Sequence, residues 1–351
     1  MFVGTSAGSI NAAYLAAKLS LGAKKATQDL VDFWRSLNKP ELIGPLAFTA
    51  VPALLGYAGR IAYLKTGQGS LASFGRFAKV LERAIGDWDQ IPSNIEAGEL
   101  DAVGLVATAA GSGGSVVFMQ TAAGVAPPPF DERNGIRYVR ARLGTDHVIA
   151  SSSIPVFFPP KEIEEPPEAS GWYWDGGTRI NTPIRPALAI GVDRLVIVAT
   201  DPPRHPAADD ADGRQRPDFD DAILNLVQAT LNDPLIEDLH SLVRVNSLVS
   251  ASRGQELAGR RRYDYIFAGP ERHGVLGTTA AEVLRERFGG PLKALSDYAV
   301  LNRLLGGQGD QGAELQSYLL FDSDFLDRVI AMGREAGDQA WRRGWLHDKL
   351  P

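Results

Sequence analysis

The pattern Gly-x-Ser-x-Gly most constrains how this chain can fold, and Gly4, Ser6 and Gly8 form it between an apolar strand end and an alanine-rich segment. A serine on a sharp turn between a strand and a helix is typical of a nucleophile elbow. We expect glycine at both flanking positions because the turn is tight and neighbouring elements crowd it. The serine would stand at the head of a helix, where free N–H groups stabilise negative charge. Taken alone, the pattern also fits a structural turn.

The composition indicates a globular chain and excludes several other classes. Of its 351 residues, 44% are hydrophobic and 22% are charged, which is usual for a globular protein with a sizeable core. The absence of cysteine excludes disulfides, thiolate zinc sites and a cysteine nucleophile. With 36 basic and 42 acidic residues, the net charge of −6 lacks the electrostatic footprint of a nucleic-acid binder.

The apolar periodicity predicts an α/β fold with a helical C-terminal part. A glycine-rich turn over 111–114 joins two expected strands; it lacks the Gly-Lys-Ser/Thr ending of a phosphate loop. The remaining loop predictions are a surface loop over 161–170 and a polar linker or loop over 201–219. We therefore expect a core over 1–200 and a mainly helical region over 220–351 packed on it. Helices are expected over 9–21, 27–37 (with Thr27 as N-cap), 74–85, 145–152, 186–191, from 233 onward and over 324–345, and strands over 102–109, 115–121, 172–174, 194–200 and 263–267.

Residues 40–64 form a strongly apolar stretch interrupted by proline and glycine. A membrane span needs about 20 uninterrupted apolar residues, so we do not expect a transmembrane helix. Two interpretations stay open. The stretch is either a pair of short packed helices or a mobile apolar cap that makes peripheral contact with a lipid surface.

A nucleophilic serine needs a base within hydrogen-bond reach. None of the five histidines (His147, His205, His240, His273 and His347) follows a strand on a loop of the expected kind. Asp175 is the better candidate, because it ends an aromatic strand and Gly176 and Gly177 let the backbone turn sharply behind it. A carboxylate serves as a general base when its surroundings adjust its pKa. Asp-Gly-Gly is also a common turn, and a Ser-His-Asp hydrolase stays open as an alternative.

These motifs together resemble the patatin-like phospholipase family. The resemblance covers most of the chain, and three ordered motifs are more specific than the elbow alone. It implies a three-layer α/β/α fold with a central, mostly parallel sheet. The matching segments are 4–12, 150–155 with 158–160, 175–177 with Asn181 and Pro183, and the later segments 186–188, 193–196 and 318–322.

The resemblance also implies the chemistry. Ser6 would be the nucleophile and Asp175 the base of a Ser-Asp dyad that hydrolyses fatty-acyl esters through an acyl-enzyme, with no metal and no cofactor. Ala7 would donate its N–H to the oxyanion. The family carries a glycine-rich oxyanion loop upstream of the serine, and only five residues precede Ser6 here. We therefore expect either a fragment of a longer protein or a relative that lacks this part.

Two functions follow from different classes. The first is a lipid acyl hydrolase acting on phospholipid or related esters. The second is an inactive remnant of the fold that binds lipid or a protein partner. No signal peptide is visible, so we expect a cytoplasmic or peripheral membrane protein, with targeting unreadable if the natural N-terminus lies upstream. Nothing in the sequence predicts an oligomeric state.

Overall fold

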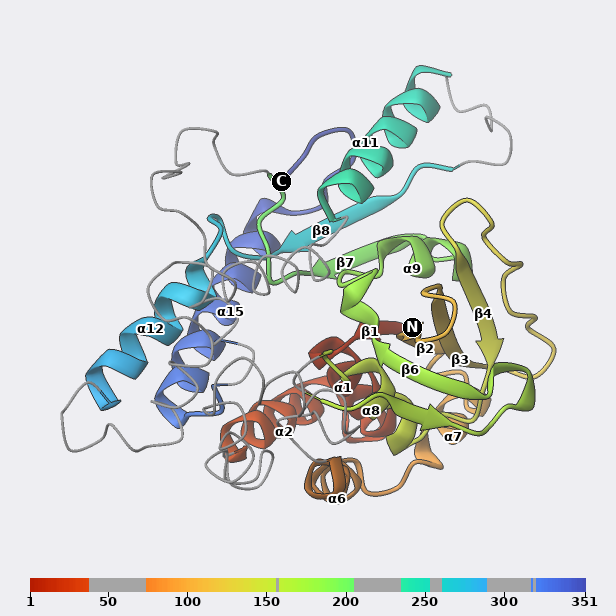
Figure 1. Ribbon diagram of the computed structural model, residues 1–351. Helices are drawn as coiled ribbons and strands as arrows, with labels where there is room; N and C mark the ends of the chain where they lie inside the picture. The colour runs from red at the N-terminus through yellow and green to blue at the C-terminus, as the bar shows by residue number, and fades with distance from the viewer. Residues whose placement is uncertain (38–73, 156–157, 205–234, 253–260, 289–316, 318–319) are drawn as a thin grey trace, which may run out of the picture.

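A mixed six-stranded sheet forms the centre of the computed structural model, which describes residues 1–37, 74–155, 158–204, 235–252, 261–288, 317 and 320–351 (Figure 1). The strands run in the order β4-β3-β2-β6-β5, and β1 pairs with β2 off this path. β2 is thus the central strand, the one that contacts three others. The strands are β1 (Phe2–Thr5), β2 (Ala102–Ala109), β3 (Ser115–Thr121), β4 (Ile136–Arg140), β5 (Lys161–Ile163) and β6 (Gly171–Asp175).

Two strands share one edge of β2 and meet end to end. β3 occupies the opposite edge over 102–108. β1 pairs in parallel with 103–106, so that Thr5 lies beside Val106. β6 pairs antiparallel with 107–109, so that Asp175 lies beside Ala107. The carboxyl ends of β1 and β6 therefore face each other at the middle of β2.

The α/β class with C-terminal helices is confirmed, whereas the expectation of a mostly parallel sheet is wrong. Within the described residues, β1–β2 and β3–β4 pair in parallel, and β2–β3, β2–β6 and β5–β6 pair antiparallel. The expected glycine-rich turn makes β2 and β3 a hairpin, which is necessarily antiparallel.

Helices cover one face of the sheet and fill the main core (Figure 1). Alternate strand residues such as Leu105 and Phe118 point to this face, where they join Ala13, Leu81 and Ile149 in one hydrophobic cluster. The small side chains of the first helix allow it to pack close to the sheet. The helices are α1 (Ala7–Ala17), α2 (Ala23–Ser36), α6 (Phe74–Ile85), α7 (Gln90–Glu96) and α8 (Thr145–Ser151).

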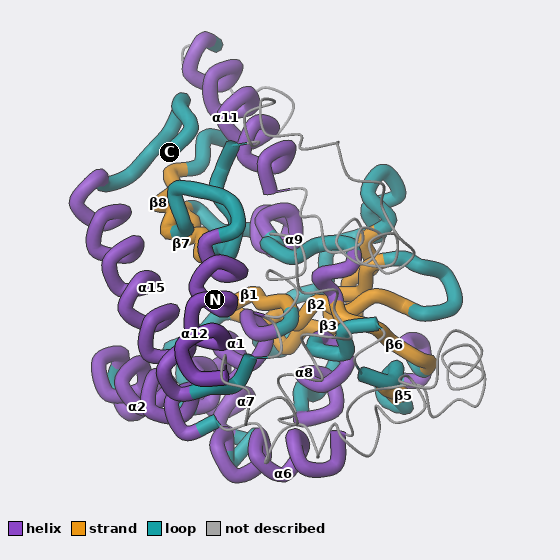
Figure 2. The backbone as a smooth tube through the Cα atoms, turned by 60° about the vertical axis from the view of Figure 1, so that its left-hand side comes forward, coloured by secondary structure: helices purple, strands orange, loops and turns teal. Residues whose placement is uncertain are grey.

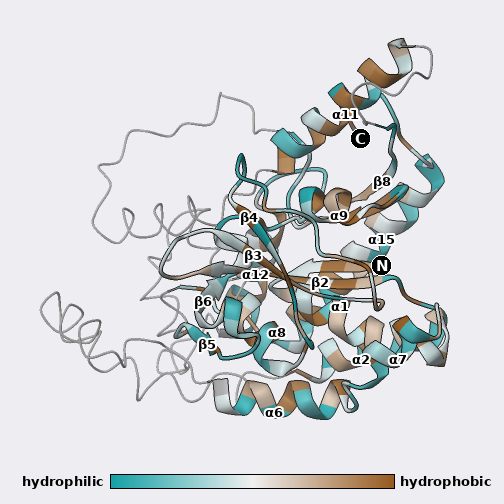
Figure 3. Ribbon diagram, turned by 90° about the vertical axis from the view of Figure 1, so that its right-hand side faces the viewer, coloured by the Kyte–Doolittle hydropathy of each residue, from teal (hydrophilic) through white to brown (hydrophobic). Residues whose placement is uncertain are grey.

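The opposite face of the sheet is covered by a thinner layer of apolar side chains. Val106, Val117 and Met119 point to this side and pack with Ile180 and with Ile190 of α9 (Ile184–Ile190). Figure 3 shows hydrophobic residues along the central strands, between the two helical layers. The expected three-layer α/β/α arrangement is therefore present, with β2 and β3 buried on both faces.

A second, two-stranded sheet lies beside the main one (Figure 2). β7 (Arg194–Val198) and β8 (Asp264–Ala268) pair in parallel, and Leu239 of α11 (Leu235–Ala251) packs against them with Leu346. The strand expected over 194–200 is therefore present, and it belongs to this second sheet. β7 alternates, with Leu195 and Ile197 buried and Val196 and Val198 exposed.

The last two long helices pack against each other and against the core (Figure 1). Val283 of α12 (Val275–Phe288) and Phe325 of α15 (Ser323–Arg343) belong to the same hydrophobic cluster as α1. The domain division at 201–219 stays a prediction, because the described residues stop at 204 there. The stretch 40–64 also lies outside the described residues.

Local expectations differ from the structure at two points. Thr27 is not an N-cap: α2 starts four residues earlier, and the Thr27 hydroxyl donates to the Ala23 carbonyl inside the helix. The loop over 161–170 contains β5 and a 3₁₀ turn (Pro167–Ala169). Two more 3₁₀ turns span Leu19–Leu21 and Gly176–Thr178.

Among the described helices, none has the length and apolarity to cross a membrane.

Candidate active site

Ser6 occupies a strained turn between β1 and α1. Its φ of 52° and ψ of −124° make it the only non-glycine residue with a positive φ in the described part of the chain. A residue held in such a region stores about 1–3 kcal/mol and persists only where its surroundings fix it. This strand–turn–helix geometry is that of the nucleophile elbow expected from the sequence.

Of the two glycines that flank Ser6, only one is required because another part of the backbone lies close to it. A Cβ on Gly4 would lie 2.1 Å from the carbonyl oxygen of Gly8 and 2.7 Å from the nitrogen of Ser9, so no side chain fits there. A Cβ on Gly8 would meet no atom within 4 Å. The expected steric requirement for glycine therefore holds at Gly4 and is wrong for Gly8.

The first turn of α1 leaves N–H groups available beside Ser6. The carbonyl oxygen of Ser6 accepts hydrogen bonds from the nitrogens of Ser9 (2.8 Å) and Ile10 (3.4 Å) and from the Ser9 hydroxyl (2.6 Å). Ala7 and Gly8 precede these donors, and helix geometry gives their N–H groups no acceptor within the helix. The positive end of the helix dipole adds to their preference for an anion. Ala7 is thus placed to donate to charge that develops next to Ser6.

Asp175 ends β6 and is almost fully buried, with 1% of its surface exposed. The Gly177 N–H donates to Asp175 Oδ1 at 2.6 Å and orients the carboxylate. Gly176 fits the turn only as glycine, because a Cβ there would lie 2.3 Å from the Val106 carbonyl oxygen. The sharp turn expected from Asp-Gly-Gly is therefore present.

The environment of Asp175 changes its acidity. Burial raises the pKa of the carboxyl from 3.8 to about 7, against the opposing effects of hydrogen bonds from the Ser6 side chain and the Gly177 N–H. Asp175 Oδ2 has no partner with ordinary hydrogen-bond distance and angles among the described residues. The Ser6 hydroxyl therefore lies close enough to lower the pKa of the carboxyl, although the two groups do not form a hydrogen bond of ideal geometry. Such loose geometry is common in catalytic pairs that have no substrate bound.

A third serine, whose role the sequence did not reveal, completes the turn. Ser151, in α8, is fully buried; it accepts a hydrogen bond from the Ser6 N–H at 3.0 Å and donates to the Val106 carbonyl at 2.6 Å. Its segment was identified only through the family resemblance, because the contact joins residues 145 positions apart.

A comparison with models of protein families identifies the family to which the chain belongs. The family model described as patatin-like phospholipase matches residues 1–188, more than half of the 351 residues. The chain belongs to the patatin-like phospholipase family. The match includes both Ser6 and Asp175 and ends within α9. It supports a lipid acyl hydrolase at the family level, with a lipid as substrate. No curated protein sequence matches the chain.

The described histidines of this patatin-like chain make no polar contact with the pair. None of them hydrogen-bonds or ion-pairs with Ser6 or Asp175. His147 is buried against Phe118, and burial lowers its pKa from 6.5 to about 4. His347 contacts Asp264 at 2.7 Å, and His205 lies outside the described residues. This geometry counts against the Ser-His-Asp alternative.

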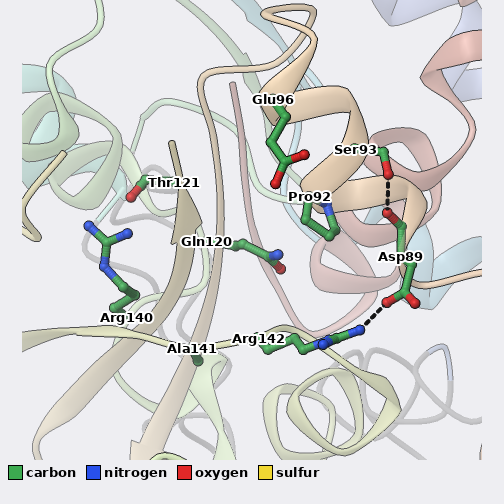
Figure 4. A pocket seen from close by; sticks show the side chains of 9 residues that line it. All are labelled: Asp89, Pro92, Ser93, Glu96, Gln120, Thr121, Arg140, Ala141 and Arg142. Carbon is green, nitrogen blue, oxygen red and sulfur yellow. Dashed lines mark hydrogen bonds and ion pairs between the residues drawn. The ribbon is translucent and has the colours of Figure 1, made fainter. Parts of the chain in front are cut away.

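A pocket of about 450 Å³ lies elsewhere on the patatin-like domain, between α7 and the ends of β3 and β4 (Figure 4). It includes Thr121, which pairs with Ala102, whereas Asp175 pairs with Ala107. Five residues correspond to about 17 Å along a strand. Figure 4 also shows Arg142 engaged in an ion pair with Asp89. The pocket is therefore separate from the Ser6–Asp175 pair.

Proposed function

We propose that this chain is a lipid acyl hydrolase in which Ser6 is the nucleophile and Asp175 the general base. The observation that carries the proposal is the end-to-end meeting of β1 and β6, because it brings an elbow serine and a buried carboxylate to the same point of β2. A carboxyl whose pKa lies near 7 is matched to proton transfer at neutral pH.

The first half of the reaction forms an acyl-enzyme. Asp175 takes the proton of the Ser6 hydroxyl while Oγ attacks the acyl carbonyl carbon, and the Ala7 N–H stabilises the resulting oxyanion. The tetrahedral intermediate collapses, the bond to the alcohol oxygen breaks, and protonated Asp175 returns its proton to the leaving alcohol. A lysolipid or another alcohol departs, and the acyl chain stays on Ser6.

The second half releases the fatty acid by the same groups. Asp175 takes a proton from a water molecule, whose oxygen attacks the acyl-enzyme carbonyl. The intermediate collapses, Ser6 leaves as the alcohol and recovers its proton from Asp175. Each group thus returns to its starting state, and the net reaction consumes one water per ester bond.

The test is ester hydrolysis by matched variants. We expect the wild type to hydrolyse p-nitrophenyl butyrate and phospholipid vesicles, and Ser6→Ala and Asp175→Asn each to lose about a thousandfold or more in kcat. His347→Ala is the control for a histidine base and should keep its activity. Equal background rates for the wild type and Ser6→Ala would contradict the proposal and favour a non-catalytic lipid- or partner-binding protein. Loss of activity in His347→Ala, with activity retained in Asp175→Asn, would favour a Ser-His-Asp mechanism.

A further inference from the structure

The carboxyl end of α8 contacts both halves of the Ser6–Asp175 pair. The Ser151 hydroxyl holds the Ser6 N–H at 3.0 Å. Two residues further, the main-chain carbonyl of Ser153 accepts a hydrogen bond from the Asp175 N–H at 2.9 Å. One short segment therefore holds the backbone of the nucleophile through a side chain and the backbone of the base through its own main chain.

The orientation of the Ser151 hydroxyl is set by its partners. A serine hydroxyl has one hydrogen to donate and lone pairs to accept. Its hydrogen goes to the Val106 carbonyl at 2.6 Å, so an oxygen lone pair is left for the Ser6 N–H. Val106 lies beside Thr5 in the sheet, directly before Ala107, which pairs with Asp175. The hydroxyl thus ties the elbow to the point of β2 where both strands end.

This contact has two consequences for Ser6. The strained backbone at φ 52° needs surroundings that fix it, and Ser151 provides the hydrogen bond to its N–H while Ser9 binds its carbonyl. The Ser6 N–H is also occupied, so it is not available to an oxyanion. The N–H groups of Ala7 and Gly8, in the first turn of α1, are the ones that can donate to the oxyanion.

We propose that Ser151 is a positioning residue, which holds the Ser6 elbow in register with β2 and so sets the approach of the Ser6 hydroxyl to Asp175. The inference rests on the proposed acyl hydrolase function. Removing the hydroxyl leaves the Ser6 N–H and the Val106 carbonyl without their partner, and the strained turn relaxes. Substrate binding should change little, because Ser151 is fully buried and its hydroxyl is not exposed to a bound substrate.

The experiment compares the wild-type chain with Ser151→Ala, Ser151→Thr and Ser115→Ala. Ser115 is a matched control, because it is a buried serine of β3 whose hydroxyl has no partner among the described residues. Three quantities are measured: kcat and KM for p-nitrophenyl butyrate, the rate of Ser6 labelling by a fluorophosphonate, and hydrogen exchange of amides in peptides covering 4–12.

Ser151→Ala should lower kcat and the labelling rate about tenfold or more, with KM nearly unchanged, and should speed exchange in 4–12. Ser151→Thr keeps a hydroxyl and should restore most of the rate, and Ser115→Ala should behave as the wild type. If Ser151→Ala does not fold, Ser151→Cys replaces it. A thiol is a weak donor and acceptor, so an intermediate rate is expected.

Wild-type labelling and exchange in Ser151→Ala, or in Ser151→Cys where that variant is used, would overturn the proposal. So would an equal loss in Ser115→Ala, since that would indicate a general packing effect. Failure of the proposed function looks different: the wild type would then be as unreactive as Ser6→Ala. In that case the hydrogen exchange of 4–12 still decides whether Ser151 holds the elbow.

Discussion

Replacement of Asp175 by asparagine should abolish activity and stabilise the fold at neutral and alkaline pH. The buried carboxyl has a pKa of about 7 in the folded protein against 3.8 as the reference for an unfolded chain. Between these values the folded state holds a proton that the unfolded state has lost. The free energy of unfolding therefore falls as pH rises through this window and levels off above about pH 7.

The size of the effect follows from the same two values. They lie about three pH units apart, and each unit corresponds to about 1.36 kcal/mol, so ionised Asp175 costs the fold about 4 kcal/mol. Asparagine is neutral at every pH and still offers an oxygen to the Gly177 N–H. The stability advantage of Asp175→Asn should therefore grow by about 3 kcal/mol between pH 5 and pH 8.5.

Urea unfolding of both proteins across this pH range measures the difference, with circular dichroism as the signal. Ser115→Ala serves as a control whose difference from the wild type should not change with pH. A constant difference between Asp175→Asn and the wild type would refute the reasoning. It would show that Asp175 is not a buried carboxyl with a raised pKa.

Three further predictions concern the pH profile, the elbow and the second sheet. Because the base must be ionised, kcat/KM of the wild type should rise with pH and level off above about pH 7, and a flat profile from pH 5 to 8 would contradict this. Gly4→Ala should destabilise the fold by about 3 kcal/mol in urea unfolding, whereas Gly8→Ala, whose Cβ meets no atom, should unfold as the wild type does. Asn246→Ala should cost about 2 kcal/mol in the same assay and leave fluorophosphonate labelling unchanged, because the buried amide binds the main chain of Tyr263 far from Ser6. Equal stability of Asn246→Ala and the wild type would argue against this role.

Periodicity and turn chemistry predicted the local elements well. The bounds expected for β2 and β3 agree with the structure, since both strands are continuous apolar runs separated by glycines. The helix over 74–85 was found from its apolar spacing, which buries Leu81 and Ile85. The elbow and the sharp turn after Asp175 were also predicted, because glycine at these positions is a strong local signal for a turn.

The arrangement of these elements was harder to predict. The run of residues before Asp175 indicates a strand, but its direction depends on pairing with β2, which is a long-range property. The family resemblance implies a Ser6–Asp175 pair in a mostly parallel sheet, whereas the two residues meet because β1 and β6 approach from opposite ends of β2. In the same way, the apolar run over 194–200 predicts a strand, but nothing near it in the sequence indicates that its partner is β8.

The contacts that hold the elbow could not be predicted from the sequence. Ser151 reaches Ser6 across 145 positions, and a buried serine in a short helix carries no local sign of its partner. Likewise, the raised pKa of Asp175 comes from burial by the whole sheet and helix layer, which no neighbouring residue indicates.

Detection of the covalent intermediate tests the central claim most directly. The wild type is mixed with p-nitrophenyl butyrate or a phospholipid, quenched in acid within the first turnover, and analysed by mass spectrometry before and after proteolysis. We expect one acyl group per chain on the peptide that contains Ser6, and no adduct in Ser6→Ala. Turnover without an acyl group on Ser6, or with the acyl group on another residue, would contradict the account.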